Sequence, residues 1–224
     1  MRDLVDDLPL IGAYFLLFGT STAAVGISST KIVSENFGRS LFAKGNAIEA
    51  FGNTIQAIGR EKLYERAIKE NENEIEKEFE LTMMIGAWIQ AAGNATNTFA
   101  TNLEIEGMER EGFRLNALGG IIQSIGAQIE TTGALMEGTQ LDKIEAYGNQ
   151  LIGLGALIDG IANAALLRDK IILGHDLLLV GSWVQVFGSI LIIYALRQKR
   201  SEDEKNQYQL EYRYGYYPNK QFEW

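Results

Sequence analysis

The sequence has no cysteine among its 224 residues, which excludes a disulfide framework and thiolate metal sites. It has two prolines, Pro9 and Pro218, and each lies close to an end of the chain. Because proline interrupts helices, the stretch from 10 to 217 is free to form long ones. His175 is the only histidine, so a metal site built on two histidines is excluded as well.

Basic residues are also scarce, since 20 Lys and Arg stand against 29 Asp and Glu, for a net charge of -9. Nucleic-acid binding needs a surplus of basic side chains, so we exclude it as a function. The first ten residues, MRDLVDDLPL, carry three aspartates where a secretory signal has a basic segment. We therefore expect no cleaved signal peptide, and a protein that is either cytoplasmic or membrane-associated.

No arrangement of residues in the sequence indicates catalysis. His175 and Asp176 are neighbours, so their side chains point in different directions on a helix. We expect Asp176 to lie at the positive end of the helix that follows. Asp6 and Asp7 precede the first apolar run and are expected to be exposed. We predict no catalytic, cofactor-binding or metal-binding residue, no cofactor, and a protein that is not an enzyme.

Glycine is abundant instead, and its spacing is regular. A glycine inside a helix costs about 1 kcal/mol relative to alanine, so its repetition must have a structural reason. Of the 24 glycines, 18 recur every seven residues. These ladders are Gly12, Gly19 and Gly26; Gly38, Gly45, Gly52 and Gly59; Gly86 and Gly93; Gly112, Gly119, Gly126 and Gly133; Gly148 and Gly155; and Gly174, Gly181 and Gly188.

Apolar residues recur at positions 3 and 6 when each ladder glycine is counted as position 0. These positions share one face, so the pattern predicts six amphipathic helices, and the seven-residue period suits a left-handed supercoil. Glycine at the edge of this apolar stripe lets two helix backbones approach closely. Position 4 is often polar, and its side chain either reaches over the glycine to the facing helix or faces solvent. These residues are Glu49, Gln56, Gln90, Asn97, Gln123, Glu130, Asp159 and Gln185.

The ladders form pairs whose first glycines lie 26 residues apart, as Gly12 and Gly38 do. Since 26 is not a multiple of seven, the phase breaks within each pair, and we place turns at 34–36, 107–111 and 168–170. The sequence therefore predicts an all-α fold of three repeated antiparallel hairpins, at about 8–59, 75–137 and 141–200. Together they form a six-helix bundle with glycine-lined contacts over 1–200, followed by a tail over 201–224.

Two segments depart from the pattern. Residues 60–80 carry 13 charged residues and no glycine. We expect two extended helix ends there, joined near Asn71 to Asn73, that form either a solvated surface or a protruding tip for a partner. The tail is rich in tyrosine and ends at Trp224. It is either loose or an aromatic strap packed on the bundle or on a neighbouring chain.

Two stretches, 8–30 and 177–196, contain no charged residue. Each is long enough to cross a bilayer core of about 30 Å. The basic RQKR that follows Leu196 suits a cytoplasmic end. A helix that is apolar all round is either a membrane span or a buried core helix, so both interpretations stay open.

Three segments, GNTIQAIG (52–59), GAWIQAAG (86–93) and GGIIQSIG (119–126), share one motif. They resemble the repeats of certain uncharacterised repetitive proteins of Bacillus-type bacteria, which carry GxWIQAxG-like heptads along much of their length. The resemblance spans residues 12–195. It implies a repeat architecture and transfers no catalytic residue.

Two functions fit these observations. We predict a non-enzymatic helical-bundle scaffold that acts through self-assembly, as a homo-oligomer, or through a protein partner. The alternative is a membrane-associated protein with helices 8–30 and 177–196 inserted in the bilayer. Solubility without detergent separates the two.

Overall fold

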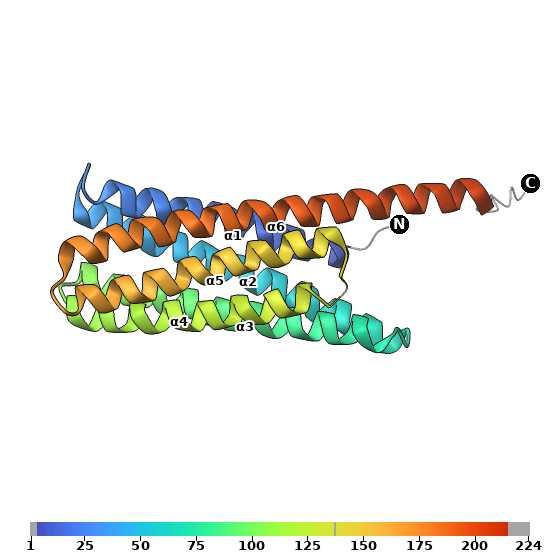
Figure 1. Cartoon of the computed structure of the whole chain (residues 1–224), viewed down its shortest axis with the longest axis horizontal. Helices are drawn as coiled ribbons and strands as arrows, with labels where there is room; N and C mark the ends of the chain where they lie inside the picture. Colours follow the sequence, from blue (N-terminus) through green and yellow to red (C-terminus); the bar gives the residue numbers. More distant parts are fainter. Residues whose placement is uncertain (1–3, 137, 215–224) are drawn as a thin grey trace, which may run out of the picture.

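Six long helices run along one axis in the computed structural model, which describes residues 4–136 and 138–214 (Figure 1). No strand occurs among these residues, so the prediction of an all-α protein with six helices is confirmed. A short 3-10 helix, η1 (Leu4–Asp7), precedes α1 (Leu8–Ser29), α2 (Glu35–Lys69), α3 (Glu74–Ile105), α4 (Glu109–Ala134), α5 (Gln140–Leu166) and α6 (Ile171–Tyr214).

Capping side chains mark the starts of three of the helices. Ser34 and Asn73 cap α2 and α3 with their side chains, and Thr139 and Asp142 form a capping box at the start of α5. Asn71 has a left-handed backbone, with φ 53°, in the turn predicted at 71–73. The break predicted near 168–170 falls in the turn between α5 and α6. Those predicted near 34–36 and 107–111 overlap the turns before α2 and α4, whose first residues they include.

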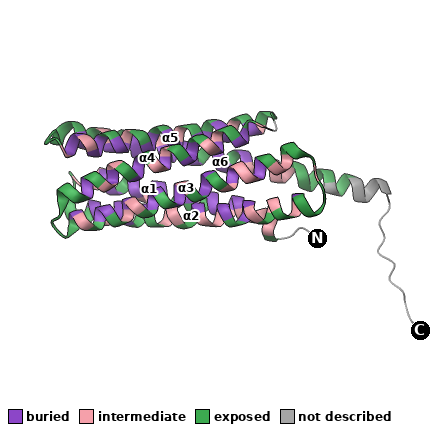
Figure 2. Cartoon of the chain, turned by 90° about the horizontal axis from the view of Figure 1, so that it is seen from below, coloured by how far each residue is buried: buried purple, intermediate pink, exposed green. Residues whose placement is uncertain are grey.

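Each helix packs against its neighbours in the chain, and α1 also packs against α6. The described helices therefore form a closed ring in chain order, and no two helices on opposite sides of it are in backbone contact. Because the ring holds an even number of antiparallel helices, η1 and the last described turn of α6 lie toward the same end (Figure 1). Buried residues follow the inward faces of the helices, as Figure 2 shows.

The apolar stripe predicted at positions 3 and 6 does not form the contact face. Position-6 residues point outward, and Phe51, Leu118 and Phe187 keep 54%, 49% and 60% of their surface exposed. Position-3 residues such as Ile48 and Ile122 are half-buried at the rim. The glycines do lie at the edge of the stripe, but the helices are buried on the other side of them. This rotation decides which residues fill the ring.

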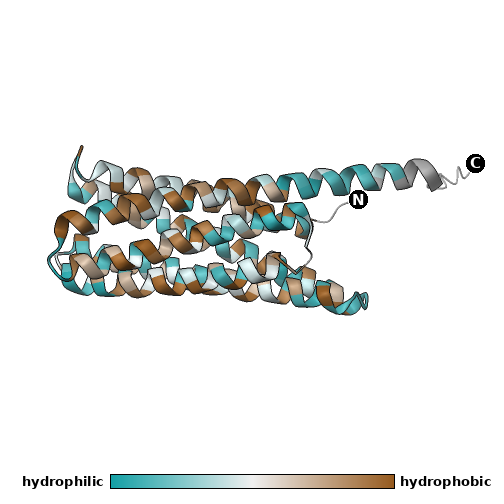
Figure 3. Ribbon diagram, in the orientation of Figure 1, coloured by the Kyte–Doolittle hydropathy of each residue, from teal (hydrophilic) through white to brown (hydrophobic). Residues whose placement is uncertain are grey.

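The two extended helix ends expected within 60–80 are present. Helix α2 continues past the first hairpin's limit of about 59 to Lys69, and α3 begins at Glu74. Helix α6 continues to Tyr214, so residues 201–214 of the predicted tail prolong α6 beyond the bundle, where its composition becomes hydrophilic (Figure 3). The rest of the tail, with Trp224, lies outside the described residues.

Three acidic residues are placed differently from their predicted positions. Asp6 and Asp7 are half-buried rather than exposed, because Asp6 pairs with Arg66 at 2.6 Å and Asp7 pairs with Arg200 at 3.2 Å. Asp176 is not at a helix start, because α6 begins at Ile171. It forms an exposed ion pair with Lys31 on α1 at 3.0 Å.

Two helical stretches of the described chain, Leu4–Ser29 and Ile171–Asn206, are long and apolar enough to cross a membrane. About half of each is buried within the bundle. A core helix of a water-soluble protein and an N-terminal signal sequence share this composition, so hydropathy alone leaves both alternatives for α1 and α6 open.

Candidate functional site

The interior of the ring is polar. Each of the eight polar position-4 residues is at most 8% exposed, so the interpretation that they face solvent is wrong. Glu49 is 2% exposed and Gln90 and Gln123 at most 1%, which places them among the most buried side chains of the protein. Large polar groups are normally kept at the surface of water-soluble proteins. The candidate functional site therefore lies inside the ring, where these polar side chains gather.

Each of these side chains begins against a glycine of the facing helix. A Cβ added to Gly19 on α1 would lie 2.8 Å from the carbonyl oxygen of Gly45 and 2.6 Å from Cγ of Glu49. Only a hydrogen atom leaves room for that side chain. The same arrangement holds for Gly155 on α5, which faces Gly181 and Cγ of Gln185 on α6. The glycines thus let long polar side chains enter the ring between closely packed helices.

A hydrogen-bonded set of side chains occupies the middle of the ring. The amide Nε2 of Gln123 donates to Oε1 of Gln185 at 2.9 Å and to Oε2 of Glu49 at 3.4 Å. The Nε2 of Gln185 donates to Oδ2 of Asp159 at 2.7 Å. Asn97, 5% exposed, packs on Gly119 across the same pair of helices as Gln123. We call these five residues, Glu49, Asn97, Gln123, Asp159 and Gln185, the central layer.

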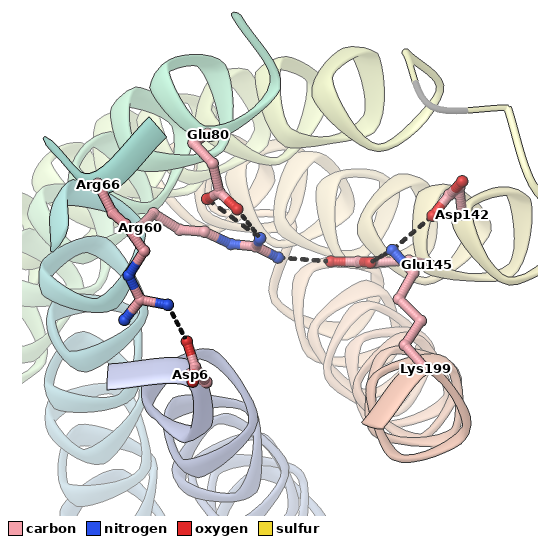
Figure 4. A network of polar contacts seen from close by, with 7 residues as sticks. All are labelled: Asp6, Arg60, Arg66, Glu80, Asp142, Glu145 and Lys199. Atoms are coloured by element: carbon pink, nitrogen blue, oxygen red, sulfur yellow. Dashed lines mark hydrogen bonds and ion pairs between the residues drawn. The ribbon is translucent and has the colours of Figure 1, made fainter. Parts of the chain in front are cut away.

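An ionic network closes the end of the ring that carries η1. The guanidinium of Arg60 on α2 bonds Glu80 on α3 at 3.1 Å and Glu145 on α5 at 3.3 Å. The ammonium of Lys199 on α6 bonds Glu145 at 2.8 Å and Asp142 at 2.5 Å. Figure 4 shows these side chains meeting across the helix ends. We call the five residues the Arg60 cluster, and they join four helices.

The charges of the Arg60 cluster stabilise one another. Burial by itself would lower the pKa of Arg60, but Glu80 and Glu145 raise it above its usual value. Burial would also raise the pKa of Asp142, but the hydrogen bond from Lys199 keeps it below its usual value. The neighbouring opposite charges therefore favour the charged forms of Arg60 and Asp142, and losing one member would weaken the charge compensation in a buried position.

A second network lies at the opposite end of the ring. Arg39 on α2 bonds Glu35 at 2.6 Å and Glu109 at 2.9 Å, and its Nε lies 3.7 Å from the carboxylate of Glu104. Asn116 donates to Glu104 at 2.6 Å. Burial raises the pKa of Glu104 to about 7, which outweighs the opposing effect of Arg39. We call these five residues the Arg39 cluster.

Each cluster borders a small cavity that is lined by both polar and apolar side chains. Near the Arg60 cluster, about 10 Å³ is open to the centre of a water molecule, among Gln56, Arg60, Glu130, Glu145 and Asn149. Near the Arg39 cluster the corresponding volume is about 20 Å³. Its polar lining includes Arg39, Glu104, Asn116, Asn163 and His175. Such volumes hold about one water molecule each, and both are polar enough to retain it.

Position 1 supplies further buried amides that the sequence interpretation missed. The side-chain amides of Asn53, Asn94 and Asn149 are at most 1% exposed and have no hydrogen-bond partner among the described residues. The signal was present, because the dipeptide Gly-Asn occurs at 45–46, 52–53, 93–94 and 148–149. Unpaired buried amides are costly in a packed core, so they point to a ligand or water in the interior.

The sequence predicted no metal-binding residue. Among the described residues, no group of three or more His, Asp or Glu side chains is placed to hold a metal ion. His175 borders the larger cavity and Asp176 pairs elsewhere, so the two do not act together.

Comparison with known proteins adds a family and no activity. A family described only as one of unknown function matches residues 7–193. No curated protein and no solved structure matches the chain.

Proposed function

We propose, for a chain that belongs to the DUF6944 family of unknown function, a non-enzymatic membrane-embedded bundle in which all six helices cross the bilayer. The single observation that carries this proposal is the inverted distribution of polarity in the ring. Ionisable and amide side chains fill the interior, and large apolar side chains cover the outside.

Apolar side chains exposed on all six helices form what we call the outer belt. Each residue of the outer belt is apolar and 40% or more exposed, and every helix contributes to it. Water-soluble monomers rarely expose an apolar patch of more than a few hundred Å². In a bilayer such a surface faces hydrocarbon, and polar groups are satisfied inside the protein. The outer belt comprises Phe18, Val25, Phe51, Ile58, Trp88, Phe99, Leu118, Ile125, Leu154, Ile161, Val180 and Phe187.

Within residues 4–136 and 138–214, only the stretches that contain α1 and α6 are apolar enough by mean hydropathy to cross a membrane. The four other helices fall short because their inward polar residues lower the average, whereas lipid would contact the outward face alone. The charge-free stretches 81–103 and 115–129 correspond to about 35 Å and 22 Å of helix. These lengths bracket a hydrocarbon core of about 30 Å. The exposed Lys44 on α2 lies five residues, or about 7.5 Å of helix, from Glu49 of the central layer, so its side chain would have to extend along the helix to bring its ammonium toward the headgroups.

The glycine contacts support three repeated hairpins suited to lipid. Gly12 faces Gly52, Gly93 faces Gly119, and Gly148 faces Gly188 across α1/α2, α3/α4 and α5/α6 respectively. In lipid the hydrophobic effect does not drive helices together, and small residues that allow close backbone packing take over that role. The glycine ladders therefore provide the helix–helix packing that an apolar interior would provide in a water-soluble bundle.

The distribution of basic residues favours one orientation. Of the 18 Lys and Arg among the described residues, 11 lie toward the end with η1 and the last described turn of α6, and 7 lie toward the opposite end. Cytoplasmic loops are enriched in basic residues, so we place η1 and the end of α6 on the cytoplasmic side.

Cysteine labelling tests the proposal directly, because the chain has no cysteine of its own. We compare Phe51→Cys on the outer belt with Lys62→Cys on the exposed end of α2, using a water-soluble maleimide on isolated membranes. We expect Lys62→Cys to react and Phe51→Cys to stay unreacted, in a protein that resists carbonate extraction. Equal labelling of both variants in a detergent-free, monodisperse preparation would instead support the soluble scaffold that acts through self-assembly.

A further inference from the structure

Carboxyl groups recur along the axis of the ring about once per heptad. Glu49 and Asp159 lie in the central layer. Glu130 comes seven residues after Gln123 of that layer, and Glu104 comes seven residues after Asn97. Seven residues of helix rise about 10 Å, so a carboxyl lies about that far from the central layer on each side. These four carboxyls are each at most 7% exposed.

The two central carboxyls have no counter-charge. Only α2 and α5 place a titratable group in this layer, while α3, α4 and α6 contribute the amides of Asn97, Gln123 and Gln185, and α1 contributes Thr20 and Ala23. Glu49 and Asp159 make no ion pair with any described residue, and they accept hydrogen bonds from amides only. An isolated buried carboxylate is so costly that it binds a proton instead. Ionisable groups of this kind inside a membrane mark ion and proton pathways.

Buried polar atoms without a hydrogen-bond partner among the described residues lie beside carboxyls at both end cavities. Asn149, 1% exposed, lines the cavity beside Glu130 and Glu145, and neither polar atom of its side chain has a partner among the described residues. Asn116, 3% exposed, lines the cavity beside Glu104, and its Oδ1 is likewise unpartnered. In the central layer itself, Oδ1 of Asp159 and Oδ1 of Asn97 are buried without a partner. The cavities therefore offer water both a binding partner and a neighbouring carboxyl.

We propose that the interior of the bundle carries protons across the membrane, with Glu49 and Asp159 as the central proton-binding pair. The proposal rests on the membrane embedding proposed above. A hydronium ion in one end cavity gives a proton to the carboxylate of Glu104 or Glu130, which breaks one O–H bond of the hydronium, forms an O–H bond on the carboxyl and leaves neutral water. The central pair, which holds a proton at rest, passes that proton to the carboxylate at the other end and takes up the incoming one in its place. The proton leaves at the other end by transfer to water, which becomes hydronium. Nothing is oxidised or reduced.

The test uses the full chain reconstituted in lipid vesicles that contain a pH-sensitive dye. An outward potassium gradient with valinomycin makes the interior negative and drives proton entry. We expect the wild-type protein to acidify the interior faster than protein-free vesicles. Glu49→Gln and Asp159→Asn should each lose this rate. The matched control is Glu111→Gln, an exposed acid at the end of α4, which should keep the wild-type rate.

Carbonate extraction of the same vesicles separates the two proposals, because a chain that washes off refutes embedding. An embedded wild-type chain that is no faster than protein-free vesicles overturns the proton proposal alone. So does a wild-type rate in Glu49→Gln, or acceleration of sodium entry in place of proton entry. Infrared spectroscopy of the wild-type protein gives a test that does not depend on whether the variants fold. The wild-type protein must show a protonated carboxylic acid band at neutral pH, and its absence overturns the proposal whatever the variants do.

Discussion

The glycine contact between α1 and α2 makes a quantitative prediction for Gly45→Ala. The added Cβ would lie 2.5 Å from the amide nitrogen of Ala23, 2.7 Å from its Cβ and 2.7 Å from the carbonyl oxygen of Gly19. Atoms in good contact stand at about 3.5–4.0 Å, so the helices must separate by about 1 Å. None of the three atoms can rotate away, because two are backbone and the third is a Cβ.

The expected loss follows from two opposing terms. Overpacking of a well-packed contact costs up to about 3 kcal/mol. Replacing glycine by alanine in a helix returns about 1 kcal/mol. We expect a net loss of about 2 kcal/mol, which lowers the melting temperature by about 4–8 °C for a chain of this size.

The control is Gly160→Ala on α5, where the nearest atoms to an added Cβ are at 3.2, 3.6 and 3.7 Å. There the helix-propensity gain should offset the small adjustment, and the melting temperature should stay the same or rise. Both variants are measured by circular dichroism and tryptophan fluorescence in one detergent. Equal melting temperatures for the two variants would refute the close backbone contact. Gly52→Leu, whose Cβ would meet Gly12 and Leu16 backbone atoms at 2.8 and 2.9 Å, extends the series to a larger loss.

Three further predictions concern charge. Arg60→Met should destabilise the bundle by about 3–5 kcal/mol, because it removes the buried cation that pairs with Glu80 and Glu145. Lys62→Met, in an exposed ion pair with Glu65, should change the free energy of unfolding by about 0.5 kcal/mol or less. Similar denaturation midpoints for the two variants would contradict the stabilising role of the Arg60 cluster. Glu104 binds its proton more tightly in the folded state, where burial raises its pKa to about 7, than in the unfolded chain, where its usual pKa is 4.5. The folded state should therefore lose stability as pH rises from 4.5 to 7, and Glu104→Gln should flatten this part of the plot of melting temperature against pH. An unchanged slope in the variant would argue against Glu104 as the group responsible. Finally, Lys69 and Lys170 lie at opposite ends of the bundle, and the proposed orientation puts Lys170 on the outer side of the membrane. In intact cells an impermeant maleimide should therefore label Lys170→Cys and leave Lys69→Cys unlabelled. The reverse result would show that the orientation is the opposite one.

The sequence alone was sufficient for the helices and turns. The seven-residue ladders and the scarcity of proline predict six long helices, and the phase breaks locate three of the turns. The turn at Asn71 to Asn73 was also predicted from the sequence, because polar residues there separate two charged helix ends. These features depend on local propensity and periodicity, which neighbouring residues carry by themselves.

The rotation of each helix was decided only by the tertiary structure. A seven-residue pattern places positions 0, 3 and 6 on one arc and positions 0, 1 and 4 on another, and it does not say which arc faces inward. Burying the apolar arc is the usual choice in water, but contact between facing glycines fixes the rotation that sends position 4 into the ring. Glu49 and Asp159 are far apart in the sequence and on different helices, so only closure of the ring between α1 and α6 makes them members of one layer. Their burial, and the outward position of Phe51 and its equivalents, follow from that closure rather than from any local signal.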